Sequence, residues 1–89
     1  MEMGVVTGSI WATKKDSRLE GLKLLIVQGD QKKIVAADLT GAGIGDKVLV
    51  CLGKAAMITA GAKELPIDAA IIGIIDDSQD AAKGGFHGY

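Results

Sequence analysis

Short runs of aliphatic and β-branched residues alternate along the chain with polar segments that contain glycine. Each run is six to ten residues long and is bounded by glycine or charged residues, which is the pattern of short β-strands. The predicted strands are residues 4–13, 22–28, 33–39, 47–52 and 67–75. Residues 54–60 are predicted to form one or two helical turns, because Pro66 blocks any longer helix.

The first predicted strand shows an alternation with two apolar faces. Val6 and Ile10 fall on one face, and Val5 and Trp11 fall on the other. Gly8 lies inside the run and predicts a bend or bulge, as at the corner of a small barrel. For Trp11, packing in the core or at an interface is favoured over stacking on a ligand.

The connections between the strands predict the fold class. Residues 14–21 form a polar loop, and residues 29–32 form a tight hairpin turn. Five short strands with one short helix before the last predict an all-β fold, a five-stranded OB-like barrel. We expect this domain to span residues 1–77. Residues 78–89 form a polar, glycine-rich tail, which is either disordered or docked on a neighbouring subunit through Phe86 and Tyr89.

Several predicted strands are apolar on both faces, although a barrel has only one inner face. The chain has 89 residues, of which 48% are hydrophobic, and a chain of this size buries only about 60–65% of its unfolded surface. Part of the apolar surface is therefore predicted to lie between subunits. A head-to-tail contact between copies of the chain closes into a ring.

The third and fourth predicted strands are joined by a loop with three glycines in five positions, Gly41, Gly43 and Gly45. Dinucleotide-binding loops need the spacing G-x-G-x-x-G before a helix, whereas a β-like run follows here. Phosphate binding is therefore disfavoured. The loop is predicted to be a strained turn, a site of close approach by a neighbouring subunit, or both.

Charge and composition exclude several other functions. The net charge is −1, so no broad attraction to nucleic acid or to anionic membranes is expected. The single cysteine, Cys51, cannot form a disulfide within the chain, and the N-terminus lacks the pattern of a signal peptide, so a cytoplasmic location is expected. His87 is the only histidine, and neither a metal site nor a cofactor is predicted.

Four sequence signatures resemble one known family, the pentameric vertex proteins of bacterial microcompartments, which include carboxysome and ethanolamine-utilisation shell proteins. The resemblance covers about residues 4–76. In chain order the signatures are Gly4-x-Val6-x-Gly8 with Thr13-x-Lys15, Leu19-x-Gly21-x-Lys23-Leu24-Leu25-x-Val27-Gln28, Ala37-Asp38-x-x-Gly41-Ala42-Gly43-x-Gly45-Asp46-x-Val48-Leu49, and Pro66-x-Asp68-Ala69-Ala70-x-x-Gly73-Ile74-x-Asp76.

The resemblance implies a structural shell protein that is not an enzyme and that assembles as a cyclic homopentamer with a narrow axial opening. Its partners would be the hexameric proteins that tile the rest of the shell. Residues expected at the subunit interface or the axial opening are Gly41, Ala42, Gly43, Ile44, Gly45, Asp46 and Lys54. A possible rim for contact with the shell is Lys14, Lys15 and Arg18.

The chain departs from the family pattern after the fourth strand. Lys54 replaces a small residue, and Met57 stands where the family has arginine. Any role of that arginine is therefore not transferred to this chain.

Two functions from other classes compete with the shell protein. An OB-fold that binds single-stranded nucleic acid needs a basic groove and stacking aromatic residues, whereas Trp11 is the only aromatic residue before the tail. An enzyme needs a nucleophile with a base, a metal cluster or a cofactor motif, and the sequence has none of these.

Overall fold

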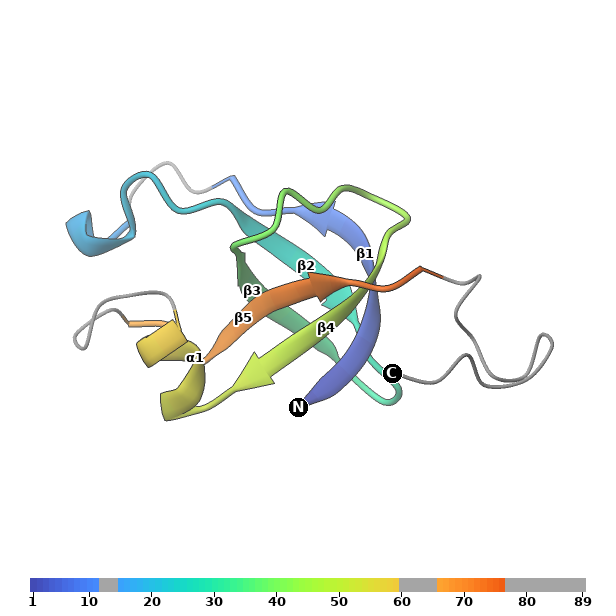
Figure 1. The fold of residues 1–89 in the computed structure, drawn as a ribbon. Coiled ribbons are helices and arrows are strands. Elements are labelled where there is room, and N and C mark those ends of the chain that lie inside the picture. Colours follow the sequence, from blue (N-terminus) through green and yellow to red (C-terminus); the bar gives the residue numbers. More distant parts are fainter. Residues whose placement is uncertain (12–14, 60–65, 77–89) are drawn as a thin grey trace, which may run out of the picture.

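The computed structural model describes residues 1–11, 15–59 and 66–76 as a five-stranded barrel. Figure 1 shows the strands wrapped around one interior, with the short helices at one end. The elements in chain order are β1 (Glu2–Ser9), η1 (Ser17–Leu19), β2 (Leu24–Gln28), β3 (Lys33–Asp38), β4 (Lys47–Leu52), α1 (Lys54–Thr59) and β5 (Ala69–Ile74).

The strand order is β1-β2-β3-β5-β4, and β4 pairs back with β1 to close the barrel. The pairing of β3 with β5 is parallel, and the other strand pairs are antiparallel. This is a closed OB-like barrel with a short helix before the last strand, so the predicted fold is confirmed. The predicted tail, residues 78–89, lies outside the described residues.

Inward-facing side chains of all five strands fill the barrel. The inner positions alternate with outer ones, so Leu25 and Val27 of β2 face Ala36 and Ile34 of β3. The largest side chains that are fully buried are those of Leu25, Ile71, Val6, Val27, Val48 and Val50. The helix α1 packs on the outside against β4 and β5, and its Ala56 is fully buried.

Strand β1 contains the bulge predicted at Gly8, but the prediction that Val6 and Ile10 share a face is wrong. Val6 pairs with Val27, but the next pair joins Gly8 to Ile26, so the register shifts between Val6 and Gly8, as Gly8 predicted. The extra residue reverses the alternation beyond it. Ile10, whose N–H donates to the carbonyl of Leu24, therefore lies outside the barrel rather than on the inner face with Val6.

Candidate assembly surface

The glycine loop, residues 41–46, crosses the top of the barrel between β3 and β4 (Figure 1). Gly41 and Gly45 have φ angles of 78° and 94°, a conformation that other residues rarely adopt. A Cβ atom built on either glycine would have no neighbour within 4 Å. Backbone conformation, and not crowding within the subunit, therefore explains these two glycines.

Gly43 is different from its two neighbours in the loop. It has no positive φ, and a Cβ atom built on it would meet only Asp46 Oδ2, at 4.0 Å. Its N–H donates to that same carboxylate oxygen at 2.8 Å, and its carbonyl accepts from the Asp46 N–H at 3.0 Å. The subunit by itself has room for a side chain at position 43. The predicted close approach at Gly43 can therefore come only from another subunit, and it stays a prediction.

Backbone hydrogen bonds hold the loop against β1. The N–H of Val6 donates to the Asp46 carbonyl at 2.9 Å, and the N–H of Gly45 donates to the Val6 carbonyl at 2.8 Å. The methyl group of Ala42 packs into the barrel core, whereas Ile44 is 73% exposed. Of the predicted interface residues in this loop, Ile44 thus presents an apolar side chain to the exterior, and Ala42 supports the loop from below.

Lys23 links the loop to the start of β2. Its ammonium group donates to the Ala42 carbonyl at 3.0 Å and lies 3.8 Å from Asp38 Oδ2. The Asp38 side chain is only 1% exposed, and its other oxygen accepts from the backbone and the hydroxyl of Thr40. The Asp38 carboxylate is therefore a nearly buried charge whose compensation depends partly on Lys23.

Replacing Lys23 with methionine is expected to lower the free energy of unfolding by about 1–3 kcal/mol, because the Asp38 carboxylate loses its cation and the Ala42 carbonyl loses its donor. Denaturation by urea at fixed protein concentration measures the change. The double variant K23M/D38N should recover part of the loss, since it removes the uncompensated charge. Lys32→Met, in the exposed β2–β3 turn, is the control. Equal losses in K23M and K32M would contradict this account.

The remaining predicted site residues lie elsewhere on the surface. Lys54 begins α1 and is exposed, but it follows β4, whereas the glycine loop precedes β4, so the strand separates them (Figure 1). Lys15 and Arg18 are exposed in the segment before β2, and Lys14 lies outside the described residues. The predicted interface residues therefore form two separate regions, which suits a head-to-tail contact between two different surfaces.

Arg18 forms a short-range pair with Asp16. Its side chain donates to both Asp16 oxygens, at 2.9 and 2.7 Å, and its backbone N–H donates to Asp16 Oδ1 at 2.9 Å. Hydrogen bonds from the Arg18 side chain, and then from its backbone N–H, hold the pKa of Asp16 far below its usual value of 3.8. This pair stabilises the local fold of η1, whose first turn Asp16 caps.

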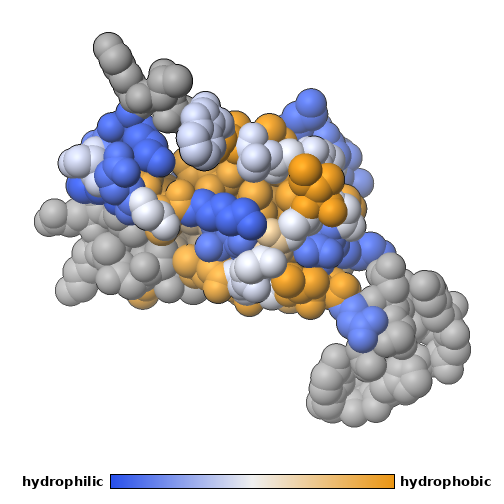
Figure 2. Space-filling model, turned by 90° about the horizontal axis from the view of Figure 1, so that it is seen from above, coloured by the Kyte–Doolittle hydropathy of each residue, from blue (hydrophilic) through white to orange (hydrophobic). Residues whose placement is uncertain are grey.

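Apolar side chains remain exposed on the outside of the barrel. Figure 2 shows the face that carries the glycine loop, where orange apolar groups gather between blue polar ones. The large hydrophobic residues that are exposed in the described part of the chain are Met1, Met3, Val5, Ile10, Trp11, Val35, Leu39, Ile44, Ile58 and Ile74. This exposure agrees with the prediction that the subunit alone cannot cover its apolar surface.

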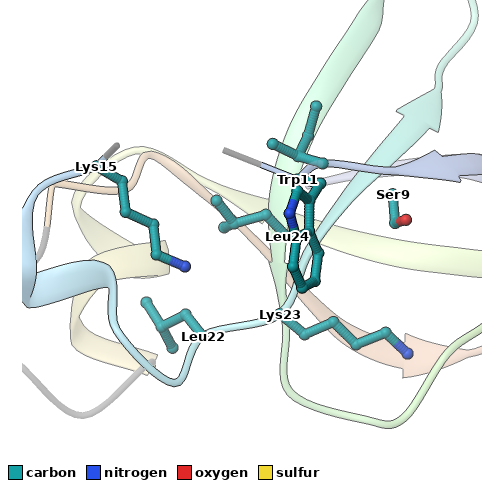
Figure 3. Close-up of a pocket in the computed structure, with 7 residues that line it drawn as sticks. Ser9, Trp11, Lys15, Leu22, Lys23 and Leu24 are labelled. Atoms are coloured by element: carbon teal, nitrogen blue, oxygen red, sulfur yellow. The ribbon is translucent and has the colours of Figure 1, made fainter. Parts of the chain in front are cut away.

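Trp11 is the most exposed of these residues, at 92%, so it does not lie in the barrel core. It borders a hollow of about 290 Å³ whose apolar lining comes from Ile10, Leu22 and Leu24. Figure 3 shows the indole ring standing beside Leu24, with Lys23 running below it. The hollow was not predicted, because the bulge that turns Ile10 outward is not visible in the alternation alone.

The part of the chain that the structure describes offers neither a metal-binding cluster nor a membrane-spanning helix. There, no group of three or more His, Cys, Asp or Glu residues is arranged to hold a metal ion. None of the helices in the described ranges has the length and apolar character needed to cross a bilayer. His87 lies outside the described residues.

A small closed barrel that leaves many large apolar side chains uncovered has the features of a subunit that associates with other chains. The sequence profile of the family described as "Ethanolamine utilisation protein EutN/carboxysome" matches residues 1–76. The chain belongs to this family.

Curated relatives cover nearly the full chain. The carboxysome shell vertex protein CcmL of Nostoc sp. is 42% identical over 84 residues, which span 85% of this chain and 83% of the relative. The bacterial microcompartment shell vertex protein EutN of Salmonella typhimurium is 37% identical over an alignment 94 positions long, which covers 98% of this chain and 95% of the relative. These names give no support to the nucleic-acid-binding alternative.

Solved structures show the same fold. The GrpN pentameric microcompartment shell protein from Rhodospirillum rubrum superimposes with a TM-score of 0.76 at 36% identity, covering 85% of this chain and 94% of the other. The pentameric shell protein MSM0273 from the RMM microcompartment gives a TM-score of 0.81 at 33% identity, covering 90% and 95%. The predicted family is confirmed, and the two solved structures are described as pentameric shell proteins.

Proposed function

We propose that five copies of this chain form a ring that occupies a vertex of a bacterial microcompartment shell and supplies the curvature that closes it. The observation that carries this function is the agreement over the whole barrel with shell vertex proteins of known pentameric structure. The protein therefore works in the shell of a microcompartment within the bacterial cytoplasm, and its mechanism is assembly.

The geometry of a closed shell explains why a pentamer is needed. A flat layer of sixfold tiles cannot close, and fivefold units at the corners introduce the missing curvature. In a cyclic pentamer every subunit uses one surface to contact the next subunit and a different surface to contact the previous one. The glycine loop and the region around Lys54 lie apart on the barrel, so they are suited to the two sides of such a contact.

The proposal extends to the partners around the ring. Hexameric shell proteins would meet the pentamer at a rim that includes Lys14, Lys15 and Arg18. Support comes from the position of the segment before β2, which projects from one end of the barrel together with η1 (Figure 1). Arg18 is pre-oriented there by Asp16, so fewer rotamers are lost when the segment meets a partner.

No catalytic role is proposed for this protein, because assembly accounts for the function of its family. The pentamer is expected to leave aldehydes, amines and bicarbonate unchanged. Turnover of any of these by the purified protein would contradict this part of the proposal.

The pentamer is tested by native mass spectrometry of the purified protein over a dilution series. A dominant mass of five subunits that persists on dilution is expected, because each subunit contacts two neighbours, so removing one subunit from the ring breaks two interfaces. A monomer at all concentrations would contradict the proposal. Another ring size would leave the fold unchanged but would remove the vertex function.

Closure of the shell is tested separately by co-assembly. A hexameric shell protein is mixed with the pentamer and the products are observed by electron microscopy. Closed polyhedra are expected with the pentamer, and open sheets or tubes without it. Closed particles of the same shape in both samples would show that the protein does not supply the curvature.

A further inference from the structure

We propose that the hollow beside Trp11 is a subunit–subunit site of the ring, and that its occupant is a neighbouring copy of this chain. The Trp11 hollow comprises Trp11, the apolar residues Ile10, Leu22 and Leu24, and the polar residues Ser9, Lys15 and Lys23. The inference rests on the proposed pentamer and adds to it a specific anchoring residue, Trp11, which none of the signatures shared with the family includes.

The hollow has apolar walls and is bordered by an exposed tryptophan. A tryptophan that is 92% exposed beside apolar walls leaves a large hydrophobic area in water. Tryptophan is enriched among the few interface residues that contribute most of the binding free energy, and it acts by filling or bordering a pocket on the partner. Figure 3 shows the indole ring next to Leu24 at the hollow.

The hollow is connected to the glycine loop through Lys23. Lys23 lines the hollow, and its ammonium group donates to the Ala42 carbonyl at 3.0 Å, so a single side chain joins the hollow to the loop. Lys23 thus connects the hollow with the loop that carries the exposed Ile44, and Figure 2 shows apolar groups among polar ones on the face that carries this loop. A neighbour that approaches Gly43 closely will also cover what lies next to the loop.

A second copy of the chain suits the hollow better as an occupant than a shell tile does. Five exposed tryptophans on a free ring would favour aggregation before the shell is built. Burial within the ring removes this hazard as soon as the pentamer forms. Lys15 lines the hollow and also belongs to the proposed rim for shell partners, so the two contacts would adjoin at Lys15. Arg18, which Asp16 holds in the same segment, does not line the hollow.

Trp11 is the only tryptophan in the chain, so its fluorescence reports this site alone. The full-length protein is examined under conditions in which native mass spectrometry detects the pentamer. We expect blue-shifted emission and several-fold weaker quenching by acrylamide than for the unfolded chain. On dilution below the dissociation midpoint, the emission should shift to the red and the quenching should increase.

Substitutions provide an independent measurement. Trp11→Ala is expected to raise the subunit concentration at which half of the pentamer dissociates by about tenfold or more, without loss of the circular dichroism of the barrel. Met3→Ala is the matched control, because Met3 is also an exposed apolar residue, at 65%, but lies near the other end of β1, away from both proposed contact regions. The control should leave the dissociation midpoint nearly unchanged.

The outcomes separate this inference from the proposed function. A pentamer whose Trp11 emission remains red and freely quenched would overturn the site and leave the vertex function intact. Protection that appears only after a hexameric shell protein is added would also overturn it, because the occupant would then be a tile. Absence of any pentamer would instead contradict the proposed function.

Discussion

Replacing Gly43 with valine is expected to prevent assembly of the ring while the barrel still folds. Within the subunit, the nearest atom to a Cβ at this position is 4.0 Å away, and the backbone has no left-handed conformation. The added side chain would therefore extend away from its own barrel into the space where we predict the neighbouring subunit. Overpacking of this kind is expected to weaken each interface by roughly 2–4 kcal/mol.

Native mass spectrometry and circular dichroism together test this result. The variant should be largely monomeric at concentrations where the wild type is pentameric, with an unchanged β-sheet spectrum. Gly43→Ala is a graded control and should cause a smaller shift in the same direction, because it adds a single carbon. If Gly43→Val assembles as the wild type does, the neighbouring subunit does not approach the loop at this residue.

Replacing Gly4 with alanine is expected to destabilise the barrel itself. A Cβ at this position would lie 2.5 Å from Cγ1 of the buried Val27 and 2.7 Å from the Gln28 carbonyl oxygen. Neither atom can move freely, since one is in the core and the other belongs to the backbone of β2. Overpacking typically costs about 1–3 kcal/mol, and each kcal/mol lowers the Tm of a domain of this size by about 4–8 °C.

The matched control for Gly4 is Gly8 in the same strand. Its Cβ would lie 3.5 Å from Ile26 Cδ1, an ordinary van der Waals contact, so Gly8→Ala should change the Tm only slightly. Both variants are compared with the wild type by thermal denaturation at one protein concentration, because the Tm of an oligomer depends on concentration. A Tm of Gly4→Ala equal to that of the wild type would contradict the close contact in the structure.

Most of the elements could be predicted from local sequence. The predicted strand 47–52 coincides with β4, and the predicted strand 33–39 ends one residue beyond β3. The first strand was predicted to start and end too late, because the bulge at Gly8 obscures the alternation at its end. Periodicity identifies a strand well only while successive residues keep alternating between the two faces.

The candidate site was predictable in part. The three glycines of the loop mark its position, and two of them have the positive φ that such a spacing suggests. The position of Ala42 in the core and the separation of Lys54 from the loop were not predictable, because both depend on how β4 lies in the closed barrel. The ion pair of Lys23 with Asp38 joins residues from different strand ends and has no local signal.

The sequence by itself determined the fold class, the family and the excess of apolar surface that requires an assembly. These properties follow from local patterns, namely alternation, turn residues and four ordered signatures. The tertiary structure alone decided which apolar residues face outward and where Trp11 lies. It also decided that Gly43 has room for a side chain without a positive φ. The physical reason is that strand register and barrel closure decide which way each side chain faces and which residues it contacts. One extra residue in β1 is enough to turn the side chains that follow it to the opposite face.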